Sequence, residues 1–163
     1  MKALFADAAI VLATGASANT VSFSNYGHQD LTGLGQDFDD IYTFDLAGNT
    51  WVSGLLTTGT LLGNAPAIDI RQVTLSHLGN SITWQETLNI DWNVAPDGVE
   101  QWALAPQSLG AGQWTLEVVG TSYADKTGNG YVANVELPEP GSVALAALAL
   151  AGAGLTSTRR RKA

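Results

Sequence analysis

The feature that most constrains the fold is an alternation of apolar and polar residues between Asn19 and Leu137. Successive side chains of a β-strand point to opposite faces, so this alternation predicts strands with one buried face. It is clearest in residues 114–118 and 131–137. The inward residues predicted for the core are Phe44, Leu46, Trp114, Leu116, Val118 and Val135.

Turn-forming sequences separate the alternating runs, and no sustained helical periodicity lies between them. These turns are expected at 47–49, 78–80, 96–98, 110–112 and 127–130. About eight short strands at this spacing predict an all-β fold, an antiparallel two-sheet sandwich of jelly-roll type, with a barrel as the main alternative. Between Ile70 and Val73 the inward parity flips, which predicts a β-bulge or a strand buried on both faces.

The charge of residues 19–137 is strongly negative. The 15 carboxylates of the chain, less Asp7 and Glu139, leave 13, against two cations, Arg71 and Lys126, for a net charge of −11. Nucleic acid and anionic lipid need a basic surface, so the composition argues against both as partners. The chain has no Cys, which excludes disulfides and thiolate metal sites.

Residues 1–18 have the parts of a secretory signal peptide. Lys2 gives a positive start, an apolar stretch follows, and the small residues Ala16 and Ala18 fit the pockets of a signal peptidase. We therefore expect a signal helix that is cleaved after Ala18. The alternative is an ordinary amphipathic first helix.

The C-terminal segment 138–163 combines three features. Pro138-Glu139-Pro140 is followed by the uncharged run 141–158 and by the basic end 159–162, which contains Arg159, Arg160 and Arg161. Eighteen helical residues reach about 27 Å, close to the bilayer core of about 30 Å, so the run predicts a marginal transmembrane helix. The basic end should stay in the cytoplasm, which leaves residues 19–137 exported.

This combination resembles the PEP-CTERM sorting signal of Gram-negative bacteria. The resemblance implies recognition near Pro138-Glu139-Pro140 by an exosortase, a membrane-embedded cysteine peptidase, which would transfer or release the exported domain. It also implies association with exopolysaccharide production. The expected location is a transient anchor in the inner membrane, then the cell envelope or extracellular matrix. A simple tail anchor behind a rigid Pro-containing linker is the alternative.

Residues 38–46 resemble the FxDxF group of PEP-CTERM proteins through Phe38, Asp40 and Tyr42, with Tyr42 in place of the second Phe. The resemblance continues in residues 111–120, and the group implies no known catalytic activity. In a strand these three side chains share one face, so Asp40 is held on an aromatic face. An uncompensated buried carboxylate would cost several kcal/mol, so we expect Asp40 to accept hydrogen bonds from backbone N–H groups of a loop.

A calcium site formed by Asp40 with Asp37, Asp39 or Asp45 is the alternative, although no EF-hand spacing is present. We expect no metal and no cofactor, and divalent cations are expected to act by charge screening alone.

Catalytic motifs are not found in the sequence. The two imidazoles, His28 and His77, lie outside any known nucleophile or metal pattern, and His77 is expected at a turn. Paired carboxylates could hydrolyse glycosides, but no particular pair is singled out among the 13. We therefore expect a protein that is not an enzyme.

Trp84, Trp92 and Trp102 lie in a run that also holds several carboxylates. Tryptophans on alternating strands usually belong to the core, but exposed indoles beside carboxylates could form a platform for sugar rings. The sequence thus favours an exported structural or adhesive protein. A polysaccharide-binding module is the second hypothesis, and a glycan-active enzyme is the third.

Overall fold

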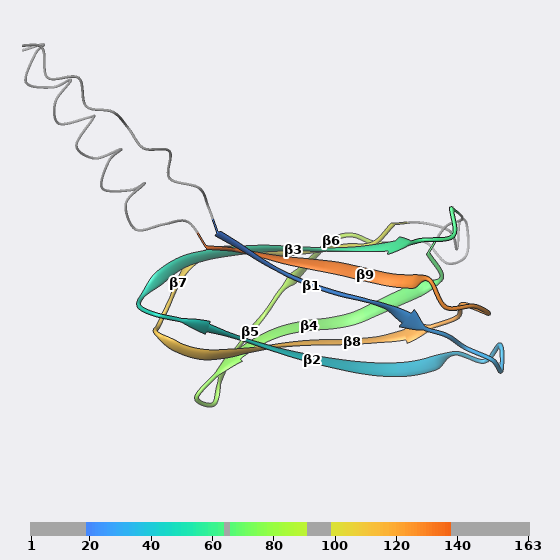
Figure 1. Ribbon diagram of the computed structural model, residues 1–163, viewed down its shortest axis with the longest axis horizontal. Helices are drawn as coiled ribbons and strands as arrows, with labels where there is room; N and C mark the ends of the chain where they lie inside the picture. Colours follow the sequence, from blue (N-terminus) through green and yellow to red (C-terminus); the bar gives the residue numbers. More distant parts are fainter. Residues whose placement is uncertain (1–18, 64–65, 91–98, 138–163) are drawn as a thin grey trace, which may run out of the picture.

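The structure is a computed structural model that describes residues 19–63, 66–90 and 99–137. Nine β-strands account for most of this part of the chain (Figure 1). Their bounds are β1 Asn19–His28, β2 Gln36–Leu46, β3 Thr50–Thr60, β4 Ile68–His77, β5 Asn80–Thr83, β6 Gln85–Leu88, β7 Gln101–Leu109, β8 Gly112–Ser122 and β9 Asn129–Leu137.

The strands form two antiparallel sheets that lie one over the other, as Figure 1 shows. Sheet A has the order β1-β9-β3-β7-β6, and sheet B has the order β2-β8-β4-β5. Apart from β6, which extends sheet A beyond β7, this is the strand order of a jelly roll. Two separate sheets confirm the predicted sandwich in place of the barrel.

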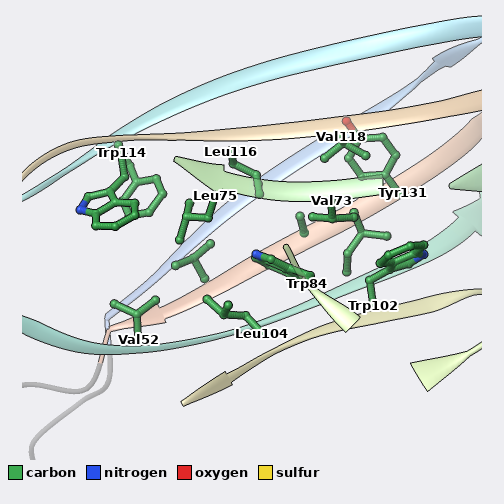
Figure 2. Close-up of a cluster of buried hydrophobic side chains, with 14 of the residues drawn as sticks. Val52, Val73, Leu75, Trp84, Trp102, Leu104, Trp114, Leu116, Val118 and Tyr131 are labelled. Carbon is green, nitrogen blue, oxygen red and sulfur yellow. The ribbon is translucent and has the colours of Figure 1, made fainter. Parts of the chain in front are cut away.

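The core lies between the inward faces of the two sheets (Figure 2). All six residues that the alternation placed there are buried, and Leu116, Val118 and Val135 have no exposed surface. In β8 the buried residues Trp114, Leu116 and Val118 alternate with partly exposed ones, as the period of two requires. Tyr131 of β9 is also buried, and Figure 2 shows it beside Val118.

The predicted change of parity in β4 is a β-bulge. The register between β4 and β8 shifts between Ile70 and Gln72, so Ile70 and Val73 both point into the core. A second irregularity lies in β3, between Val52 and Gly54. The ring of Trp84 packs so close to Gly54 that a Cβ there would strike it. Gly54 is therefore required by close packing.

The two ends of the described domain lie side by side. Asn19, the first residue of β1, pairs with Leu137, the last residue of β9. Both lie at the left end of the sandwich in Figure 1. Within the described residues, no helix is long and apolar enough to cross a membrane. The predicted signal and transmembrane helices, residues 1–18 and 141–158, lie outside the described part of the chain.

Candidate functional site

Asp40 lies at the centre of a polar cluster that joins the edge strands of the two sheets. It extends from β2, the edge of sheet B, toward β1, the edge of sheet A. Asn25 Nδ2 donates to both of its carboxylate oxygens at 3.1 Å, and His28 Nε2 lies 2.8 Å from Oδ2. The hydroxyl of Tyr131 on β9 also donates to Oδ2, at 2.5 Å. The cluster therefore bridges the layers along their open side.

Aromatic rings lie around this carboxylate, as the spacing of Phe38, Asp40 and Tyr42 predicted. The His28 ring stacks on Phe38 with 3.7 Å between centroids, and the Tyr42 hydroxyl lies 3.0 Å from that of Tyr131. The prediction that Asp40 accepts hydrogen bonds is confirmed. The predicted donors were wrong, because three side chains from β1 and β9 take the place of loop N–H groups.

Electrostatics favour the ionised form of Asp40. Burial acts to raise its pKa, but the hydrogen bonds from His28 and Tyr131 outweigh it and hold the pKa below the ordinary value of 3.8. Burial raises the pKa of Tyr131, and the hydrogen bond to Asp40 adds to this shift, so its hydroxyl stays protonated and donates. The cluster is thus built around one negative charge.

The neighbouring carboxylates do not converge on Asp40. Asp37, Asp39 and Asp45 have the opposite strand parity and are exposed. Asp37 accepts a hydrogen bond from Thr121 and lies 3.1 Å from Arg71 Nη2. No group of three potential ligands for a metal ion occurs among residues 19–63, 66–90 and 99–137.

Glu100 is a carboxyl group buried in the core, whose burial was not predicted from the sequence. It is 1% exposed, its Oε2 accepts the Ile70 N–H at 2.8 Å, and its Oε1 accepts the Trp102 Nε1–H at 3.0 Å. Burial raises its pKa to about 7, and the nearby charges of Asp69 and Glu86 contribute. Strand parity could have revealed it, because Glu100 shares the inward face of Trp102 and Leu104.

Trp84 and Trp102 belong to the core. Trp84 is 2% exposed and Trp102 is 8% exposed, so neither presents a ring to a ligand, and Trp92 lies outside the described residues. The platform hypothesis is therefore wrong for Trp84 and Trp102. Trp84 Nε1 is buried without a hydrogen-bond partner. The exposed indole among the described residues is Trp51 on β3, with 55% of its surface accessible.

Both histidines are bonded into the fold. His28 belongs to the Asp40 cluster, and His77 Nδ1 donates to the Gln113 carbonyl at 2.7 Å. The His77 ring stacks on Trp114 with centroids 4.9 Å apart. His77 is the last residue of β4, so it lies directly before the turn at Leu78 and Gly79 and not in the turn, where it was predicted.

The predicted processing residues lie outside the described part of the chain. They are Ala16, Ala18, Pro138, Glu139, Pro140, Arg159, Arg160 and Arg161. The described strands nearest to them are β1, whose first residue is Asn19, and β9, whose last residue is Leu137. The candidate processing segments therefore adjoin the same end of a two-sheet sandwich.

Comparison with known proteins identifies the C-terminal segment. Residues 136–162 match the family model described as the PEP-CTERM protein-sorting motif. The chain therefore carries a PEP-CTERM protein-sorting motif, and this motif implies exosortase-dependent sorting of an exported protein in a Gram-negative bacterium. Membership in the FxDxF group stays a prediction.

No curated protein matches the chain. One similar solved structure is that of the infectious bursal disease virus Gx strain, with 13% identity and a TM-score of 0.21. The match covers 88% of this chain and 48% of the viral chain, so the chain spans about half the length of that relative. A TM-score this low supports no argument about fold or function.

Proposed function

We propose that this protein is a structural or adhesive component of the cell envelope or extracellular matrix, delivered by an exosortase and associated with exopolysaccharide production. One observation carries the proposal. The described strands of the sandwich run from Asn19 to Leu137, the residue before Pro138-Glu139-Pro140. Both predicted signals can therefore be removed without removing any of the nine described strands, which suits a domain that is passed on intact.

The outer face of sheet B supports an adhesive role. The strand register aligns four hydroxyl residues across four strands: Thr43, Thr115, Ser76 and Ser81. Each is exposed or partly exposed. A row of hydroxyl groups on a flat sheet can exchange hydrogen bonds with a hydroxylated polymer.

A non-catalytic role fits the buried carboxyl groups. Both oxygens of Glu100 are occupied by N–H donors inside the core, and Asp40 is occupied by Asn25, His28 and Tyr131. Neither group is placed to reach a glycosidic bond, so we propose that the protein is not an enzyme.

Intact-mass and terminal-peptide analysis tests the sorting step. We expect protein from the culture medium to begin at Asn19 and to lack the tail after the 138–140 region. Glu139→Ala should leave the precursor in the membrane fraction, because the motif is altered. Glu136→Gln is the matched control, since Glu136 lies in the matched segment but within β9. Released protein that retains residues 159–162 would contradict the proposal.

A polysaccharide-binding module is the second candidate, and the exposure of Trp51 favours it. An indole on the outer face of a sheet can stack on the apolar face of a sugar ring. If this is the function, Trp51→Ala should abolish retention on the host's exopolysaccharide, whereas Ile41→Ala on the other sheet should not. Unchanged retention of Trp51→Ala would remove this candidate.

A further inference from the structure

Four exposed leucines gather at one end of the sandwich. Leu31 and Leu34 lie between β1 and β2, and Leu61 and Leu62 lie between β3 and β4. Their exposed fractions are 83%, 87%, 71% and 49%. These loops, together with the β8–β9 connection, lie at the right of Figure 1, opposite Asn19 and Leu137. We call these four residues the leucine tip.

The loops that present the leucine tip are fixed by hydrogen bonds. Asp30 is 3% exposed, and its carboxylate accepts the N–H groups of Thr32 and Gly35 at 2.8 and 2.7 Å. The Asp30 N–H donates to the Ala124 carbonyl at 2.7 Å, which ties the β1–β2 loop to the β8–β9 loop. The exposure of Leu31 and Leu34 is therefore imposed by a closed turn.

The second pair of leucines is held in the same way. The Leu61 N–H donates to the Gly128 carbonyl at 2.8 Å, and the Gly128 N–H donates to the Tyr26 carbonyl at 2.7 Å. Gly128 has a φ of +104°, and a Cβ there would contact the side chain of Leu62. Three loops thus form one connected surface.

The loops of this end carry little net charge. In the described residues of the three loops, the exposed ionisable groups with formal charge are Asp125 and Lys126, which have opposite signs. The buried Asp30 is enclosed by its own loop. With Asp30 included, the described residues of the three loops sum to a charge of −1, within a domain whose net charge is −11.

We propose that the leucine tip inserts into the interfacial region of a zwitterionic phospholipid bilayer. Burying one Leu side chain stabilises by about 1.5–3 kcal/mol, and at about 25 cal/mol per Å² this corresponds to an apolar area of about 60–120 Å². Four leucines offer roughly 240–480 Å², which is below the roughly 800 Å² per partner of a stable protein interface. Protruding side chains need a partner that conforms to them, and lipid does so. The acidic body excludes an anionic surface.

The leucine tip is well separated from the C-terminal end of the domain. They lie at opposite ends of β9, whose nine residues span about 30 Å. Lipid contact at the leucine tip is thus distinct from any contact that the sorting segment makes, and the two can be measured independently.

Site-specific fluorescence in the full-length protein tests the proposal. The chain has no Cys, so Leu34→Cys and Leu78→Cys each give one labelling position, and both leucines are 87% exposed. Leu78 lies in the β4–β5 turn, away from the leucine tip. With phosphatidylcholine vesicles that contain nitroxide lipid, we expect several-fold stronger quenching of the label at position 34 than at position 78.

Two further variants separate lipid insertion from other causes. Leu31→Ser with Leu61→Ser should lower quenching at position 34 to the level at position 78, whereas Ile41→Ser with Leu55→Ser should leave it unchanged. Circular dichroism checks that all variants are folded. Equal quenching at both positions, or quenching that survives the leucine-tip substitutions, would overturn the proposal. A concentration-dependent emission change without vesicles would also overturn it, because the occupant would then be a second copy.

Discussion

The half-buried Asp40 and the buried Glu100 respond to pH in opposite directions. The pKa of Asp40 is lowered by its hydrogen bonds with His28 and Tyr131, so its stabilising effect is lost as the pH falls through that lowered value. The pKa of Glu100 is raised by burial from 4.5 to about 7. The folded state therefore binds more protons than the unfolded state in this range, and stability falls as the pH rises from 4.5 to 7.

Glu100→Gln should remove most of this pH dependence. In the wild type, we expect the free energy of unfolding to decrease by on the order of 1–3 kcal/mol between pH 4.5 and 7.5, measured by urea denaturation. The variant should lose stability at pH 4.5, since an amide nitrogen cannot accept an N–H, but its profile should be nearly flat. Glu117→Gln, on the outer face of β8, should keep the wild-type slope. A wild-type profile that rises over this range would contradict the assignment.

At the scale of the strands, β8 carries the most consequential packing in sheet B. It lies between β2 and β4 and presents Trp114, Leu116 and Val118 to sheet A. Each of these side chains contacts the core that both sheets share. The stability of the domain should therefore be sensitive to truncation on this strand.

Leu116→Ala should lower the free energy of unfolding by about 2–5 kcal/mol, because it leaves a cavity between the sheets. Ile41→Ala, on the neighbouring strand but 63% exposed, should change it by less than about 0.5 kcal/mol. Chemical denaturation of both variants measures the difference. A loss below about 0.5 kcal/mol for Leu116→Ala would mean that the inward parity of β8 is wrong.

Strand faces were predictable because they depend on neighbours two residues apart. The inward residues of β8 and β9 and the bulge in β4 follow from that local rule. The hydrogen-bond donors of Asp40 do not follow from this local rule. Tyr131 is 91 residues away in the sequence, and only the jelly-roll strand order brings it close to Asp40 on β2. The leucine tip was not predicted for the same reason: its two loops are far apart in the sequence and are joined by hydrogen bonds to the β8–β9 loop. Glu100 was missed although its parity indicated an inward position.

At the scale of the whole molecule, the main electrostatic feature is an excess of negative charge. Between Asn19 and Leu137 there are 13 carboxylates and two cations. Repulsion of this kind destabilises the folded domain and is weakened by added salt. Asp37, Asp39 and Asp45 face outward and do not converge. We therefore expect calcium to screen the negative charge of the whole domain and not to bind at one specific site.

Thermal unfolding should show the same increase in Tm in calcium chloride and in sodium chloride of equal ionic strength. A specific site that is occupied only in the folded state would add about 2.7 kcal/mol at a hundredfold excess over Kd. A large shift seen with calcium alone, and abolished by Asp40→Asn, would overturn this expectation and assign a metal site to β2.

The position of Leu137 also determines how the domain would bear mechanical load. β9 lies between β1 and β3 and pairs with both along most of its length. If the protein is held at Leu137 and pulled at the leucine tip, force runs parallel to β9. The ladder hydrogen bonds, which lie perpendicular to the strands, are then loaded together in shear. A pull between Asn19 and Leu137 would instead separate one pair at a time, so this fold should resist force most strongly along the axis from anchor to tip.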